Sequence, residues 1–239
     1  MIGLRFDNYP KPPNIIAYIA DIGSLKFEKI EGKYHTINIQ IKNEELNSNF
    51  ENEREKFVTE GYLSLLDQNK KILGELSICD ITILEKHKNS NLILTAKVHE
   101  SRSGELDVWK MYFQNSIKTV GLWKELSEEN KEGWLVVSYN FQKHKITKDK
   151  DNLVVKLDGE LIDSELDFYC ALGEAVNGIG GYFGFGLDGL HDCFCGGFGV
   201  GKPFTLIWSN HEYSKRNLEN YFDSIISIFK EYKYLVELK

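Results

Sequence analysis

The sequence of residues 182–193 is Tyr-Phe-Gly-Phe-Gly-Leu-Asp-Gly-Leu-His-Asp-Cys. Its glycines predict a loop that leads into a short helix, and Asp188 and Asp192 fall four positions apart on one face of that helix. Two like charges at this spacing cost an isolated helix roughly 0.2–0.5 kcal/mol. Because such local rules tend to be broken at functional sites, the two carboxylates indicate a face that binds a positively charged group.

The predicted helix is amphipathic, with one side for a core and one for solvent. On a helical wheel the apolar side holds Leu187, Leu190 and Phe194, with Cys193 at their edge. The opposite side holds Asp188, Asp192 and Cys195. Asp188 lies near the helix N-terminus, where the backbone dipole favours a negative charge.

The flanking sequence predicts a small α/β domain with a three-stranded parallel sheet and helices. Strand patterns occur at Leu153–Leu157, Pro203–Trp208 and Tyr234–Leu238. Ser164, with Asp167 three residues later, predicts a helix start with a capping box. An apolar stripe from Leu218 to Tyr232 predicts the last helix.

The first 150 residues have a different pattern, which predicts a mostly-β domain. Short alternating or β-branched runs occur at Tyr34–Ile41, Gly61–Leu66, Lys71–Leu84 and Asn91–Val98. Residues 43–56 are a charged exception, which we interpret as a surface loop or a solvated helix. A lysine-rich stretch, Gln142–Asp151, then separates the two patterns. We therefore expect an α+β protein of two domains: residues 1–148, of unknown function, and residues 149–239.

The bulk composition predicts a folded cytoplasmic protein. Of the 239 residues, 42% are hydrophobic and 27% charged, which is typical of globular domains. The first residues do not form a secretory signal, and no apolar run is long enough to span a membrane. The four cysteines lack the paired spacing of a disulfide framework, so we expect reduced thiols.

The charge is unevenly distributed along the chain. Residues 1–150 hold 22 basic and 22 acidic side chains, whereas residues 151–239 hold 7 basic and 14 acidic ones. An acidic domain repels nucleic acid and lipid headgroups and steers a basic protein into contact. The C-terminal domain is therefore expected to bind a basic protein, and neither nucleic acid nor a membrane.

Several motifs near the glycine-rich segment suggest cofactor sites, but none has the required context. Residues 196–202 nearly match a phosphate-binding loop, but Pro203 replaces the serine or threonine that binds magnesium, and a strand pattern follows instead of a helix. Gly184–Gly189 fits GxGxxG without a strand directly before it. His191, Cys193 and Cys195 spread around one helix instead of converging on a metal. We expect no cofactor, no metal and no catalytic constellation.

Four segments together resemble a known family in order and spacing: residues 157–162 (Leu-Asp-Gly-Glu-Leu-Ile), 182–196, 204–208 and 228–231 (Ile-Phe-Lys-Glu). On these segments, residues 152–239 resemble barstar, the family of intracellular inhibitors of the ribonuclease barnase. In that family a helix and the loop before it plug the active-site cleft of the ribonuclease, and carboxylates take the place of substrate phosphates.

The resemblance implies roles for particular residues. Asp192 would be the central phosphate mimic, Asp188 its neighbour, Tyr182 an aromatic contact from the loop and Glu231 a flanking acid. The full partner-binding set implied is Tyr182, Phe183, Gly184, Asp188, His191, Asp192, Cys195, Gly196 and Glu231.

This sequence departs from the family pattern around the acidic centre. His191 replaces a tryptophan, Phe183 a second tyrosine and Cys195 a threonine, and the loop carries extra glycines. We therefore expect altered contacts there, and the identity of the target stays open.

The function that the resemblance implies is that of a bacterial immunity protein of the toxin–antitoxin type, not an enzyme. Its partner would be a basic extracellular-type ribonuclease or a toxin nuclease domain. The alternative is an interaction module whose barstar-like face binds a partner other than a nuclease, with a ligand-binding or regulatory N-terminal domain. The oligomeric state is not predicted.

Overall fold

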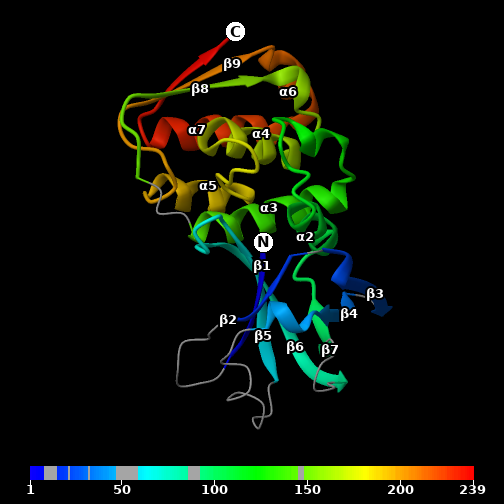
Figure 1. The fold of residues 1–239 in the computed structure, drawn as a ribbon. Helices are drawn as coiled ribbons and strands as arrows, with labels where there is room; N and C mark the ends of the chain where they lie inside the picture. The colour runs from blue at the N-terminus through cyan, green and yellow to red at the C-terminus, as the bar shows by residue number, and fades with distance from the viewer. Residues whose placement is uncertain (8–14, 21, 32, 47–58, 86–91, 145–147) are drawn as a thin grey trace. The chain divides into compact units, whose positions relative to one another are not determined.

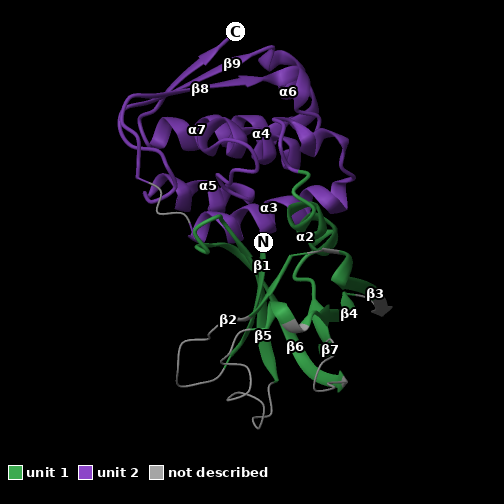
Figure 2. Ribbon diagram, in the orientation of Figure 1, with its two compact units in different colours: residues 1–116 green, residues 117–239 purple. Residues whose placement is uncertain are grey.

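The computed structural model describes residues 1–7, 15–20, 22–31, 33–46, 59–85, 92–144 and 148–239 (Figure 1). The chain divides into two compact units, Met1–Ser116 and Ile117–Lys239 (Figure 2). Within the described residues, no helix combines the length and the apolar character that crossing a bilayer requires.

The N-terminal unit is built on one antiparallel sheet of seven strands. The strands are β1 (Ile2–Phe6), β2 (Ile15–Ile19), β3 (Leu25–Glu31), β4 (Tyr34–Ile41), β5 (Glu60–Leu66), β6 (Ile72–Glu85) and β7 (Leu92–His99). Their order across the sheet is β2-β1-β5-β6-β7-β4-β3. Among its described residues, the unit also contains two short 3-10 turns, η1 (Ile22–Ser24) and η2 (Asn43–Glu45), and the helix α2 (Glu105–Phe113).

Alternating burial along these strands builds the core of this unit. In β4 the residues Ile37, Ile39 and Ile41 are fully buried while their neighbours are more exposed, as expected for a strand with one face in the core. The mostly-β fold predicted for this part of the chain is confirmed. Of the charged segment 43–56, η2 covers the start, and residues 47–56 lie outside the described residues.

The C-terminal unit contains a three-stranded parallel sheet in the order β10-β9-β8. Its strands are β8 (Leu153–Asp158), β9 (Phe204–Ser209) and β10 (Leu235–Leu238). The helices are α3 (Glu128–His144), α4 (Glu165–Asn177), α5 (Gly186–Phe194), α6 (His211–Leu218) and α7 (Asn220–Glu231), with 3-10 turns η3 (Leu122–Glu125) and η4 (Gly159–Leu161). In Figure 1, α4 and α7 lie beneath the sheet, and α5 and α3 lie beneath them. The predicted parallel sheet with helices is confirmed.

The capping box predicted at the start of α4 is present. The hydroxyl of Ser164 accepts a hydrogen bond from the backbone N–H of Asp167, and the carboxylate of Asp167 accepts one from the backbone N–H of Ser164. The last helix differs from the prediction, because the apolar stripe is divided between two helices. Leu218 ends α6, and α7 starts after Glu219, whose positive φ of 50° breaks the helical backbone.

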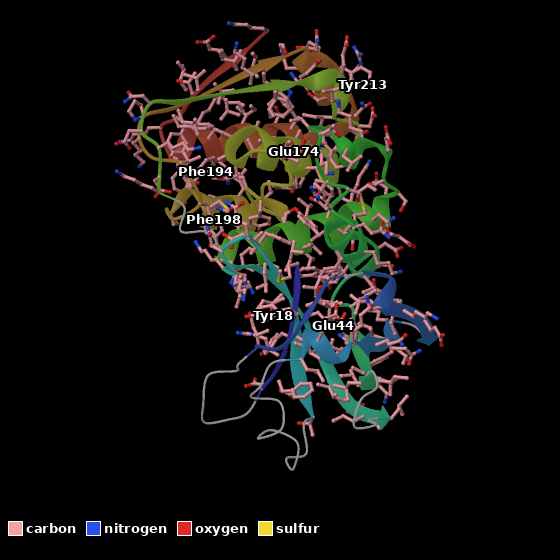
Figure 3. All side chains as sticks on the ribbon, in the orientation of Figure 1. Tyr18, Glu44, Glu174, Phe194, Phe198 and Tyr213 are labelled. Carbon is pink, nitrogen blue, oxygen red and sulfur yellow. The ribbon has the colours of Figure 1, made fainter. Side chains whose placement is uncertain are left out.

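The compact C-terminal unit is larger than the domain expected at 149–239, because η3 and α3 also belong to it. The ammonium group of Lys131 in α3 lies 2.6 Å from the carboxylate of Asp167 in α4. Glu174 of α4 (labelled in Figure 3) accepts hydrogen bonds from the Trp123 indole at 3.0 Å and from the Gly121 backbone at 2.7 Å. These contacts tie residues 117–144 to the fold that follows them.

Candidate protein-binding site

The loop before α5 is held in one shape by side chains of α4. The Asn177 side-chain amide donates to the carbonyl oxygens of Tyr182 at 2.8 Å and Phe198 at 2.9 Å, which joins the segments before and after α5. Gly173 and Gly181 approach so closely that a Cβ at Gly173 would collide with the Gly181 carbonyl oxygen. The loop is therefore packed directly on the backbone of α4.

Gly184 allows the chain to turn into α5. Its φ is +97°, a conformation that favours glycine, and a Cβ there would lie 3.1 Å from the Leu190 backbone. Gly184 therefore has a structural purpose, because it lets the loop fold back onto the helix that it precedes.

Helix α5 buries the side predicted to be apolar. Leu190, Cys193 and Phe194 are buried, whereas Leu187 is only partly buried. Phe194, labelled in Figure 3, packs edge-on against Phe229 of α7 with ring centroids 5.0 Å apart. This contact fixes α5 on α7, so the opposite side of α5 faces solvent.

The two carboxylates predicted to act together are exposed on α5. Within the described residues, neither the carboxylate of Asp188 nor that of Asp192 forms a hydrogen bond or an ion pair. Burial raises the pKa of Tyr221 in the first turn of α7, and the negative charges of Glu165 and then of Asp188 raise it further. An external cation could therefore approach both carboxylates without first breaking a contact.

His191 and Cys195 are joined by Tyr232, which follows α7. The Tyr232 hydroxyl lies 3.4 Å from the imidazole Nδ1 of His191 and 3.6 Å from the thiol of Cys195, and it donates to the His191 carbonyl oxygen at 3.2 Å. The hydrogen bond with Cys195, followed by partial burial, raises the pKa of Tyr232 to about 12. The tyrosine stays neutral at physiological pH and fixes this end of α5.

Glu231 lies next to this cluster. It is exposed, and its charge is among the causes of the raised pKa of the adjoining Tyr232. The packing of α5 on α7 thus brings Glu231 to the same end of α5 as His191 and Cys195. Its contribution to binding stays a prediction.

Three other predicted contact residues are buried. Tyr182 is only 8% exposed, and Phe183 is fully buried with its ring 5.2 Å from that of Phe194. Gly184 is buried as well. In this structure these residues shape the loop, while Asp188, His191, Asp192, Cys195, Gly196 and Glu231 have partly or fully exposed surface.

The glycine-rich segment after α5 binds a carboxylate of the protein itself. The carboxylate of Asp149 accepts backbone hydrogen bonds from Gly197 at 2.9 Å and from Gly199 at 2.9 Å. The near match to a phosphate-binding loop thus has a structural basis, since successive glycine N–H groups form an anion-binding turn. The anion bound by this turn is the carboxylate of Asp149. From the sequence alone, Asp149 had no expected role beyond its place in the lysine-rich stretch between the two domains.

Three residues near the site were not predicted from the sequence: Tyr139, Lys202 and Tyr232. The Lys202 ammonium group lies 6.0 Å from the centroid of the Tyr232 ring. Tyr139 packs on Tyr182 with ring centroids 5.1 Å apart. The sequence contained a hint for Tyr232, because its polar hydroxyl stands at the end of the apolar stripe of the last helix. It contained no hint for Tyr139, which lies far from residues 182–196 in the sequence.

Part of the C-terminal unit matches a known protein family. Residues 152–237 match the family described as Barstar (barnase inhibitor). The match starts just before β8 and ends within β10, so it includes α4 to α7 and excludes η3, α3 and the N-terminal unit. The resemblance predicted for the C-terminal region is confirmed, because residues 152–237 are similar to the barstar family of barnase inhibitors.

Proposed function

We propose that this protein is an immunity protein that inhibits a basic ribonuclease in the cytoplasm of the cell that makes the toxin. The observation that carries this proposal is the pair of exposed carboxylates, Asp188 and Asp192, which have no protein partner among the described residues and belong to a barstar-family domain. Arginine and lysine side chains that bind RNA phosphates would bind these carboxylates by charge-assisted hydrogen bonds.

The packing around α5 supports binding without a large rearrangement. Asn177 holds the segments on both sides of the helix, and Phe194 and Tyr232 hold the helix on α7. Binding sites that are already formed lose little conformational entropy when a partner docks. The site would therefore present both carboxylates to an active-site cleft in a fixed geometry.

The charge of the domain supports the choice of a basic partner. Residues 151–239 hold twice as many acidic as basic side chains. Complementary charge speeds the encounter of two proteins. Glu231 extends the acidic character to the end of α7, beside the His191 and Cys195 cluster.

The proposal is tested by titrating the full-length protein against barnase-type ribonucleases in an RNA-cleavage assay. We expect the wild type to abolish cleavage and Asp192→Ala to be far weaker. The matched control is Glu237→Ala, which removes one negative charge from β10, where Glu237 pairs with the exposed Lys239 and not with a residue of α5. We expect this control to inhibit like the wild type.

Two results would count against the proposal. Equal inhibition by the wild type and Asp192→Ala would show that Asp192 does not act as a phosphate mimic. A folded wild-type protein that inhibits none of these ribonucleases would favour the alternative, in which the same face binds a partner other than a nuclease.

A further inference from the structure

Helix α3 lies outside the match to the barstar family but is attached to it by buried contacts. The side chains of Lys131 and Asp167 are only 9% and 5% exposed, and the distance between their charged atoms is 2.6 Å. Glu174 adds hydrogen bonds to Trp123 and Gly121 at the start of the same segment. Residues 117–144 are thus a fixed part of the C-terminal unit.

The second half of α3 reaches the loop that precedes α5. The ring of Tyr139 packs against that of Tyr182, with centroids 5.1 Å apart and an angle of 59° between the planes. Tyr139 is 42% exposed and Tyr182 only 8%. The resemblance implies that Tyr182 is an aromatic contact for the partner, but at this place on the surface the more exposed aromatic ring is that of Tyr139.

A cation accompanies this ring. Lys143 is exposed and lies one helical turn after Tyr139, with its ammonium group 5.4 Å from the ring centroid. This distance is within the range of a cation–π interaction. The end of α3 therefore presents an aromatic ring and a positive charge together.

This pair adjoins the acidic side of α5 through Tyr182. A Cβ at Gly189 would lie 3.6 Å from the Tyr182 hydroxyl, so that hydroxyl lies against α5 at the residue that follows Asp188. Burial raises the pKa of Tyr182, and the charges of Cys193, Tyr139 and Asp192 add to the effect in that order. Tyr139, Tyr182 and α5 are therefore neighbours in one surface.

We propose that Tyr139 and Lys143 are partner-contact residues that extend the inhibitory surface beyond the barstar-family domain and select among ribonucleases. This rests on the proposed function. The chemistry implies a ribonuclease with a carboxylate and an apolar or aromatic side chain at the rim of its basic cleft. The carboxylate would pair with Lys143, and the apolar group would pack on the Tyr139 ring, as aromatic residues do in protein interfaces.

The test measures the affinity of the full-length protein for a ribonuclease that it inhibits. We expect Tyr139→Ala and Lys143→Ala each to weaken binding about tenfold, and Lys143→Glu to weaken it more because it places a negative charge opposite a carboxylate. Tyr139→Phe is the matched control, since it keeps the ring contact with Tyr182 and should stay within about twofold of the wild type. Thermal unfolding of each variant shows whether the fold is intact.

The outcomes separate this inference from the proposed function. If Asp192→Ala loses affinity while Lys143→Ala and Lys143→Glu bind like the wild type, α3 does not contact the partner and this inference is overturned, whatever Tyr139→Ala does. If Asp192→Ala also binds like the wild type, the proposed function itself fails. A loss in the Lys143 variants that occurs with one ribonuclease and not with another would confirm the selective role.

Discussion

Lys131 and Asp167 form a buried ion pair that joins α3 to α4, with 2.6 Å between the ammonium nitrogen and a carboxylate oxygen. Burial lowers the pKa of Lys131, but the carboxylates of Asp167 and Glu128 outweigh it, so the net shift is upward and the lysine is charged. The other oxygen of Asp167 accepts from the backbone N–H groups of Asp163 and Ser164 at the start of α4. One carboxylate thus caps α4 and anchors α3.

Replacing this lysine should destabilise the protein strongly. We expect Lys131→Met to lower the free energy of unfolding by about 3–5 kcal/mol, because it leaves the Asp167 charge buried without its partner. Lys143→Met, an exposed lysine on the same helix, should change it by no more than about 0.5 kcal/mol. Urea unfolding measures both, and equal stability of the two variants would show that the ion pair is not an anchor.

Removing the segment before β8 should weaken the C-terminal unit. A fragment of residues 149–239 lacks Trp123 and Gly121, which donate two hydrogen bonds to the buried Glu174. The Glu174 carboxylate would keep the Gly180 N–H as a donor but lose these two, and a buried carboxylate with too few donors is costly. We expect fragment 117–239 to unfold cooperatively at a clearly higher temperature than fragment 149–239 in circular dichroism. Equal unfolding temperatures would instead support the shorter domain predicted from the sequence.

High pH should destabilise the fold through Cys193. Burial and the nearby charge of Asp192 raise the pKa of its thiol from 9.0 to about 12. As the pH rises, this thiol therefore ionises in the unfolded chain at a lower pH than in the folded protein. The free energy of unfolding falls between about pH 9 and about pH 12 and levels off above that range. Between about pH 9 and about pH 11, the stability of Cys193→Ala should fall less steeply than that of the wild type. Parallel pH profiles would contradict this assignment.

Salt should slow the association with a ribonuclease. The acidic excess of residues 151–239 would attract a basic partner through long-range electrostatic forces. Added salt shortens the range of these forces, because the Debye length is about 8 Å at physiological ionic strength and about 3 Å at 1 M. We expect the association rate constant to fall as salt is added while the dissociation rate constant changes little. Stopped-flow mixing at several salt concentrations separates the two, and a salt-independent association rate would argue against charge steering.

Much of the C-terminal fold could be predicted because its signals are local. The capping box at Ser164 and the amphipathic pattern of residues 186–194 each depend on residues within one or two helical turns. Asp188 and Asp192 could be placed on one exposed face for the same reason. The break at Glu219 was missed because the apolar stripe continues across it.

The surroundings of the site could not be predicted because they depend on contacts between distant residues. The contact of Tyr139 with Tyr182, and the cradle that Gly197 and Gly199 form around Asp149, join residues more than 40 positions apart. No spacing rule in the sequence connects such residues. The attachment of α3 through Lys131 could not be predicted for the same reason, since Lys131 and its partner Asp167 are 36 positions apart.

Competition with RNA for the ribonuclease active site is tested by measuring inhibition of a barnase-type ribonuclease at increasing concentrations of its RNA substrate. If the carboxylates of α5 occupy the place of RNA phosphates, inhibition is competitive, and Asp192→Ala raises the inhibition constant by about two to three orders of magnitude, as expected for one member of a desolvated charge pair. Inhibition that RNA does not relieve, or that Asp192→Ala leaves unchanged, would show that α5 does not mimic RNA phosphates.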